Sequence, residues 1–119
     1  LTDYRGALLT VEQLLSRYPN DTQFKVFRAR YLILTKNFSK AREYIKSLTE
    51  EEQQLPIIRG LQGQLWLTEG EFEKAIPGLE KLYQLLPNTH NTALLFATHK
   101  RLGEKQVAFD FLQRHIELY

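Results

Sequence analysis

Apolar residues recur along this chain at spacings of three and four, the pattern of helices with one buried face. Such stripes cover Thr22–Thr35, Ser39–Leu48, Leu55–Leu67 and Phe72–Leu86, and Asn37 interrupts the first two. In the first of these helices the stripe consists of Phe24, Phe27, Tyr31 and Leu34. No stretch alternates apolar and polar residues as a strand does, so the pattern predicts an all-α protein.

The sequence resembles itself when it is displaced by 34 residues. The aligned columns are Tyr4, Phe38 and Phe72; Ala7, Ala41 and Ala75; Val11, Ile45 and Leu79; Leu14, Leu48 and Leu82; and Ala29, Gly63 and Ala97. Ala108 follows Ala75 by 33, which indicates a one-residue deletion near Gly103. Units of two helices at this period predict stacked helical hairpins, with the small residues at the helix crossings.

Local signals mark where several helices begin and end. Gly70 is expected to stop one helix, because glycine enters the left-handed conformation at little cost. Thr49 and Glu52 have the spacing of a capping box. Pro77 is expected in the first turns of its helix or at a kink. Asn88, Asn91 and Thr92 are candidate N-caps for the last hairpin.

The composition excludes several classes of protein. Without cysteine, the chain has no disulfide scaffold, cysteine-based metal site or thiol nucleophile. No apolar run approaches the roughly 20 residues of a membrane helix. At 119 residues the chain holds three and a half units, and it starts with Leu1 in mid-hairpin. We therefore expect a piece of a longer array, whose ends pack on further repeats of the same chain or on a second copy.

Charge is unevenly distributed. Residues 22–46 carry seven basic residues against one acidic residue, and residues 47–80 carry seven acidic against two basic. A basic block can bind nucleic acid or another anionic polymer. The interpretation that we prefer is that neighbouring repeats complement each other's charge, and we do not expect a nucleic-acid partner.

No residue pattern predicts catalysis, a cofactor or a metal site. His90, His99 and His115 lack the spacing of a helical metal site, although His99 and His115 could meet in space. No serine is framed by glycines as a nucleophile. Trp66 could stack on a ligand, but a core position is the preferred interpretation.

The repeated unit resembles the tetratricopeptide repeat. Residues 56–89 carry its pattern most fully, through Gly63, Trp66, Gly70, Phe72, Ala75, Leu79, Leu82 and Pro87. The resemblance implies a right-handed superhelical solenoid of antiparallel helix pairs over residues 1–119: a half repeat 1–21 and repeats 22–55, 56–89 and 90–119. It also implies a protein–protein interaction scaffold without catalysis, and not an enzyme.

In this family the first helix of each repeat lines a concave groove that holds a peptide or partner helix. When the groove positions of the family are transferred to this sequence, the groove residues are Gln23, Val26, Arg30 and Ile33; Ile57, Gly60, Leu61, Gln64 and Leu67; and Asn91, Leu94, Thr98 and Arg101. The equally weighted alternative is that the apolar members pack only on neighbouring helices. Lys25 and Arg28 stand where the family has bulky apolar residues, so we expect first helices shifted by about one residue.

The run Leu86-Pro87-Asn88, with Gly103-Glu104-Lys105, is similar to long bacterial repeat proteins of exopolysaccharide and PEP-CTERM sorting systems. This similarity implies an exported envelope protein that organises partners; a cytoplasmic protein is the alternative. Two other roles stay open, binding of an anionic polymer through residues 22–46 and a structural spacer within a longer array.

Overall fold

The structure is a computed structural model that describes residues 3–119, and all its regular elements in that range are helices. The helices are α1 (Tyr4–Arg17), α2 (Thr22–Leu34), α3 (Phe38–Ser47), α4 (Glu50–Gln53), α5 (Pro56–Thr68), α6 (Phe72–Leu85), α7 (Thr89–Arg101) and α8 (Lys105–Leu118). The all-α prediction is confirmed. The first two residues of the expected half repeat 1–21 lie outside the described residues.

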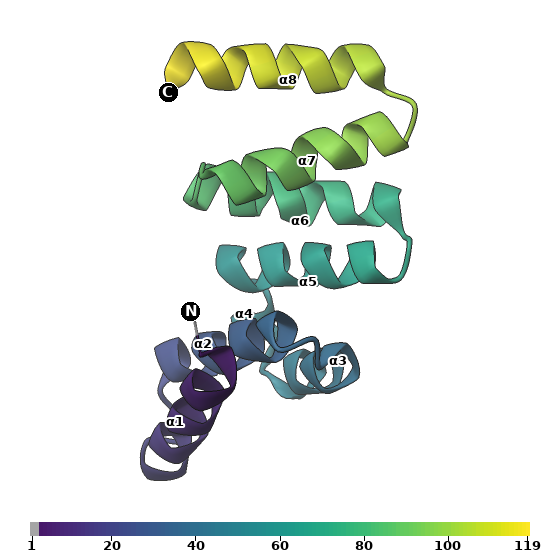
Figure 1. The fold of residues 1–119 in the computed structure, drawn as a ribbon. Coiled ribbons are helices and arrows are strands. Elements are labelled where there is room, and N and C mark those ends of the chain that lie inside the picture. Colours follow the sequence, from purple (N-terminus) through teal and green to yellow (C-terminus); the bar gives the residue numbers. More distant parts are fainter. Residues whose placement is uncertain (1–2) are drawn as a thin grey trace.

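The helices pair into antiparallel hairpins that stack along one direction (Figure 1). Helices α5, α6, α7 and α8 follow one another towards the C-terminal end, while α1, α2 and α3 pack at the other end with their axes turned (Figure 1). The array measures 48 × 27 × 24 Å. Because each hairpin packs on its neighbours, the chain has the elongated form of a solenoid.

The spacing of the helices follows the sequence period. Helices α2 and α5 begin 34 residues apart, and so do α3 and α6. The buried Thr92, Leu95 and His99 of α7 follow the buried Ile58, Leu61 and Leu65 of α5 by 34 residues. Gly103 follows Gly70 by 33, and both glycines have a positive φ, so the shorter spacing begins between His99 and Gly103. Ala97 keeps the 34-residue spacing, but its side chain is exposed.

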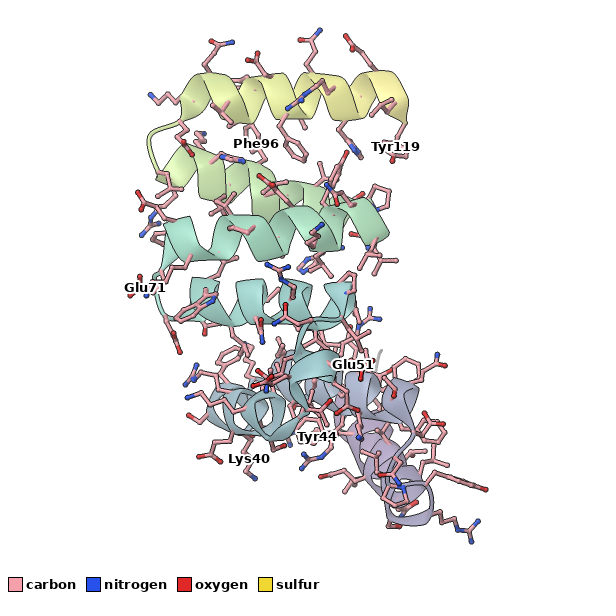
Figure 2. All side chains as sticks on the ribbon, turned by 180° about the vertical axis from the view of Figure 1, so that it is seen from behind. Lys40, Tyr44, Glu51, Glu71, Phe96 and Tyr119 are labelled. Carbon is pink, nitrogen blue, oxygen red and sulfur yellow. The ribbon has the colours of Figure 1, made fainter. Side chains whose placement is uncertain are left out.

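The buried residues form two clusters that share the hairpin α5–α6. The first comprises Ala29, Leu32, Ala41, Ile45, Leu48, Ile58, Leu61 and Leu65. The second comprises Ala75, Leu79, Leu95 and Phe111. Phe96 of α7 (Figure 2) packs against Phe109 of α8, and the centroids of the two rings are 5.7 Å apart.

The expected stripe on α2 is wrong. Ala29 and Leu32 are the buried residues of this helix, and Leu34 is exposed. Phe24 and Tyr31 are half-buried on the side towards α1, with ring centroids 6.2 Å from Tyr18 and 6.3 Å from Tyr4. Helix α2 thus packs on two sides. The predicted stripe contained only the side with the aromatic residues and missed the side with Ala29 and Leu32.

The expected shift of the first helices does not occur in α2. This helix begins at Thr22 and buries Ala29 completely. Lys25 and Arg28 occupy the positions that are apolar in the family because each forms an ion pair. Lys25 pairs with Glu52 at 2.8 Å, and Arg28 pairs with Glu12 at 3.2 Å. Their aliphatic stems pack while the charged ends are paired.

The signals at Gly70, Thr49 and Asn88 are confirmed, whereas the other two N-cap candidates, Asn91 and Thr92, lie inside α7. Gly70 follows α5 with φ of +76°. The Thr49 hydroxyl accepts from the Glu52 backbone N–H, and the Glu52 carboxylate accepts from the Thr49 N–H. Asn88 is the N-cap of α7, since its side chain accepts from the Asn91 N–H at 2.8 Å. Pro77 lies inside α6.

Candidate partner-binding surface

The residues expected in the groove differ widely in their burial. Four are buried and unavailable to a partner in this structure, namely Gly60, Leu61, Asn91 and Thr98. Six are half-buried: Val26, Ile33, Ile57, Gln64, Leu67 and Leu94. Three are exposed: Gln23, Arg30 and Arg101. Gly60 is buried against Leu82 of α6.

The residues on α7 serve mainly to attach this helix to its neighbours. The Asn91 amide donates to the Leu86 carbonyl at 2.9 Å, which satisfies the end of α6. The Thr98 hydroxyl donates to the Leu94 carbonyl at 2.7 Å. Leu94 and Leu67 both pack on the second core cluster. Arg101 lies over the Phe72 ring at 5.2 Å.

The residues on α2 and α5 form the accessible part of the expected groove. These two helices pack against each other. Residues at intervals of three and four share one side of a helix, which places Gln23, Val26, Arg30 and Ile33 together on α2, and Ile57 and Gln64 together on α5. We call these six residues the first-helix face. Val26, Ile33 and Ile57 pack against the first core cluster yet keep part of their surface exposed.

Three of the seven basic residues in segment 22–46 pair with acidic residues of neighbouring elements. Lys25 pairs with Glu52 of α4, and Arg42 pairs with Glu69 at the end of α5, 2.9 Å away. The Arg28 guanidinium pairs with Glu12 and lies 4.3 Å from the centre of the Tyr44 ring. The interpretation that neighbouring repeats complement each other's charge is therefore supported by these contacts.

Two titratable groups in this region carry shifted pKa values. Burial raises the pKa of the Tyr44 hydroxyl, although the nearby Arg28 charge opposes the shift. The hydrogen bond from Lys25 lowers the pKa of the Glu52 carboxyl, and the Thr49 N–H adds to the effect. Both groups act in holding α2, α3 and α4 together.

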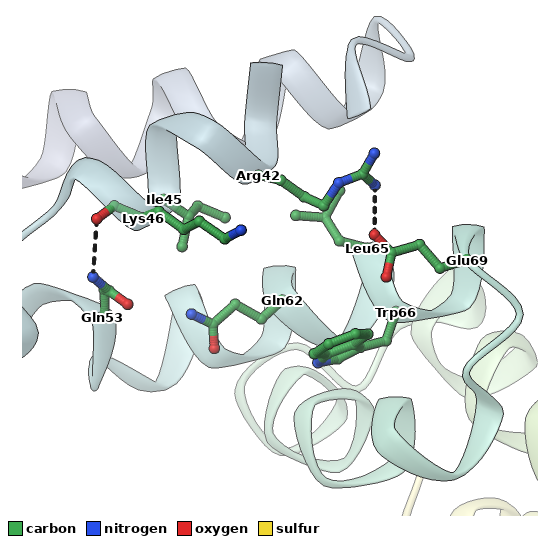
Figure 3. Close-up of a pocket in the computed structure, with 8 residues that line it drawn as sticks. All are labelled: Arg42, Ile45, Lys46, Gln53, Gln62, Leu65, Trp66 and Glu69. Carbon is green, nitrogen blue, oxygen red and sulfur yellow. Dashed lines mark hydrogen bonds and ion pairs between the residues drawn. The ribbon is translucent and has the colours of Figure 1, made fainter. Parts of the chain in front are cut away.

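A cleft between α3 and α5 contains the single tryptophan of the chain (Figure 3). We call it the Trp66 cleft. It is lined by Arg42, Ile45, Lys46, Gln53, Gln62, Leu65, Trp66 and Glu69, and it encloses about 490 Å³. The Trp66 side chain is 36% exposed, so the preferred interpretation of Trp66 as a core residue is wrong. The position of Trp66 within its repeat did not predict this exposure, because exposure depends on how neighbouring hairpins pack together.

Two of the three histidines, His99 and His115, contact polar side chains. The Tyr83 hydroxyl and the His115 Nδ1 are 2.6 Å apart, and the His99 Nδ1 is 3.0 Å from the Glu104 carboxylate. Among residues 3–119 no three metal-ligating side chains come together, and no helix in that range has the length and apolarity to span a membrane.

These features define a helical-repeat solenoid. A family model described as "Tetratricopeptide repeat" matches residues 2–65, which is more than half of the sequence. The chain belongs to the tetratricopeptide repeat family. The match ends inside the repeat 56–89, although that unit carries the family pattern most fully.

Two solved structures share the fold. One is described as "MamA 41-end from Desulfovibrio magneticus RS-1" and the other as "MamA RS-1 ArsTM double mutant". Each is 19% identical in sequence and superposes with a TM-score of 0.71 over 98% of this chain. The chain spans 66% of the length of each. No curated protein matches the sequence.

Proposed function

We propose that this protein is an interaction scaffold that holds a peptide or helix of a partner protein on the first-helix face. Tetratricopeptide repeats are typical of protein-interaction scaffolds and are typically non-catalytic. On the first-helix face the expected groove residues of two adjacent helices are exposed or half-buried, whereas Leu61, Asn91 and Thr98 are buried.

The observation that carries the proposal is the mixed character of this face on two adjacent helices. Val26, Ile33 and Ile57 offer half-buried apolar surface, and exposed Arg30 lies one helical turn from Val26 and Ile33. Arg30 has no acidic partner in the part of the chain that the structure describes. An amphipathic helix with an acidic residue beside its apolar side matches this arrangement.

A pull-down from the source cells tests the proposal, with the tagged protein as bait. Arg30→Glu should reduce the captured partner at least about tenfold, because one attraction becomes a repulsion next to the apolar contact. Lys40→Glu on α3 is the matched control, since it makes the same charge change at an exposed site. Both variants should keep the helical circular-dichroism spectrum of the wild type.

Equal capture by the wild type, Arg30→Glu and Lys40→Glu would exclude the first-helix face. Leu61→Glu is unsuitable as a test, because Leu61 is 2% exposed and a charge there would disrupt the core. Salt distinguishes the anionic-polymer role. A steep fall in affinity with salt for nucleic acid would support that role and contradict ours.

The proposal also covers the sub-family to which this repeat protein belongs and its location in the cell. We propose a bacterial envelope scaffold of the exopolysaccharide or PEP-CTERM kind, supported by the run Leu86-Pro87-Asn88. The exposed apolar residues of α8, with Ile116 and Leu118 about seven-tenths exposed, support packing on further repeats or on a second copy. Sedimentation of the protein over a concentration range tests that contact, and a monomer at all concentrations would rule out the second copy.

A further inference from the structure

The Trp66 cleft continues around the tryptophan onto α6. A neighbouring hollow of about 320 Å³ is lined by Arg59, Gln62, Gly63, Trp66, Lys74, Pro77 and Gly78. The two hollows share Gln62 and Trp66, so the surface runs from α3 across α5 to α6. Where α5 meets α6, Gly63 and Gly78 have no side chains to interrupt it.

Positive charge surrounds this surface. Its cations are Arg42, Lys46, Arg59 and Lys74, whereas Glu69 is the acid among the lining residues. Arg42 is already paired with Glu69 at 2.9 Å. Lys46, Arg59 and Lys74 have no acidic partner within residues 3–119. The surface therefore complements a ligand that carries carboxylates.

Apolar and amide groups occupy the centre of the same surface. Ile45 and Leu65 form the base of the Trp66 cleft, and Lys74 Nζ lies 4.9 Å from the centre of the Trp66 ring. Gln62 lines both hollows and lies along α5 between Gln53 and Trp66 (Figure 3), and its amide makes no hydrogen bond to another residue among residues 3–119. A free amide beside an apolar wall suits the backbone of an extended peptide, because it can both donate and accept.

We propose that the Trp66 cleft binds an acidic, extended segment of a partner protein. One apolar side chain of the segment contacts Trp66 and Leu65, its carboxylates pair with Lys46 and Lys74, and its backbone pairs with the Gln62 amide. A peptide fits better than a nucleic acid, since single strands are held by several stacking rings and this cleft offers one. The site uses no residue of the first-helix face and does not depend on the proposed function.

Trp66 makes the site directly measurable, because it is the single tryptophan in the sequence. The full 119-residue chain is titrated with short end-capped peptides in which one Leu or Phe is flanked by Asp and Glu. Matched peptides carry Asn and Gln instead, and a single-stranded DNA oligonucleotide supplies the same net charge. Trp66 fluorescence and the indole N–H signal in NMR report the binding.

We expect a saturable change with the acidic peptides and an affinity at least about tenfold lower for the neutral ones, because the carboxylates supply charge-assisted contacts. Lys46→Glu with Lys74→Glu should lower the affinity for acidic peptides by about tenfold or more. Lys40→Glu with Lys81→Glu is the matched control and should leave the affinity within about twofold, since both lysines are exposed and outside the lining. Arg30→Glu should also bind normally.

Four results would overturn the proposal, the last of them a loss of peptide binding in Arg30→Glu. The first is the absence of a saturable Trp66 response to every acidic peptide. The second is tighter binding of the oligonucleotide than of any peptide. The third is an equal loss of affinity in the two double variants, which would indicate general charge attraction. If Arg30→Glu alone abolished peptide binding, the peptide would occupy the first-helix face, which would contradict this site and support the function proposed above.

Discussion

Glu52 takes part in two interactions at once, and at the scale of single residues it shows how a short segment is held in place. One carboxylate oxygen accepts from the Thr49 backbone N–H at 3.0 Å and completes the capping box of α4. The other accepts from Lys25 Nζ of α2 at 2.8 Å. Only 15% of the Glu52 side chain is exposed, so water competes weakly for these contacts. Four residues of helix are thereby anchored to the preceding hairpin.

These contacts predict a pH dependence of stability. The Lys25 hydrogen bond lowers the pKa of Glu52 below its ordinary value of 4.5 in the folded protein. A group with a depressed folded pKa stabilises the fold above its unfolded pKa, and this contribution is lost as the pH falls through the folded value. Glu52→Gln keeps a residue suited to the capping box and removes the charge. It should cost at most about 1 kcal/mol of unfolding free energy at pH 7, and this cost should shrink as the pH falls below the ordinary pKa of the carboxyl.

Urea denaturation at a series of pH values measures this difference. Glu51→Gln is the matched control, because Glu51 is exposed on the same helix and makes no ion pair with a described residue. Its difference from the wild type should stay small at every pH. A Glu52→Gln deficit that is the same at pH 3 and pH 7 would show that the charge of Glu52 is not the cause.

At the scale of elements, the closest approach between helices is the crossing of α5 and α6. A β-carbon placed on Gly78 would lie 2.5 Å from the Arg59 carbonyl oxygen and 2.8 Å from the Gly63 Cα. One placed on Gly63 would lie 2.9 Å from the Gly78 Cα. These distances are shorter than real contacts, and the obstacles are backbone atoms that cannot rotate away. The two glycines therefore set the separation of this hairpin.

Gly78→Ala should destabilise the protein by about 1–3 kcal/mol, because overpacking forces the two helices apart. The loss is expected even though alanine favours a helix over glycine by about 1 kcal/mol. Thermal and urea denaturation measure it, with Glu80→Ala as the control on the exposed side of α6. A Gly78→Ala protein as stable as the wild type would mean that the crossing has room for a methyl group.

Helix positions could be predicted from the sequence, because they depend on local patterns and on a repeated unit. The expected Phe72–Leu86 differs from α6 by one residue at its end. The turn at Lys36 could not be recognised locally, since this residue adopts φ of +64° where the corresponding position of the next hairpin holds Gly70. The buried side of α2 was mispredicted because packing on two sides gives no single stripe. Only the assembled array separates Ala29 and Leu32 from the aromatic residues.

At the scale of the whole molecule, contacts between hairpins determine what a partner can reach. Arg42 of α3 and Glu69 of α5 join two repeats and form one edge of the Trp66 cleft. The sequence predicted a binding surface on the first helices and applied the same positions to each repeat. In the assembled array Asn91 and Thr98 of α7 are buried, whereas Trp66 of α5 is 36% exposed. The residue pattern of a single repeat cannot predict such exposure, because it depends on the packing between hairpins.

Binding of a partner protein to the first-helix face is visible residue by residue in a chemical-shift map of the protein with its captured partner. Backbone amide signals are assigned in the free protein and followed as unlabelled partner is added. We expect the largest shifts on α2 and α5, around Arg30, Ile57 and Gln64, and none of comparable size around the exposed Lys40 of α3. Shifts confined to α8, or spread evenly over the basic residues, would contradict it.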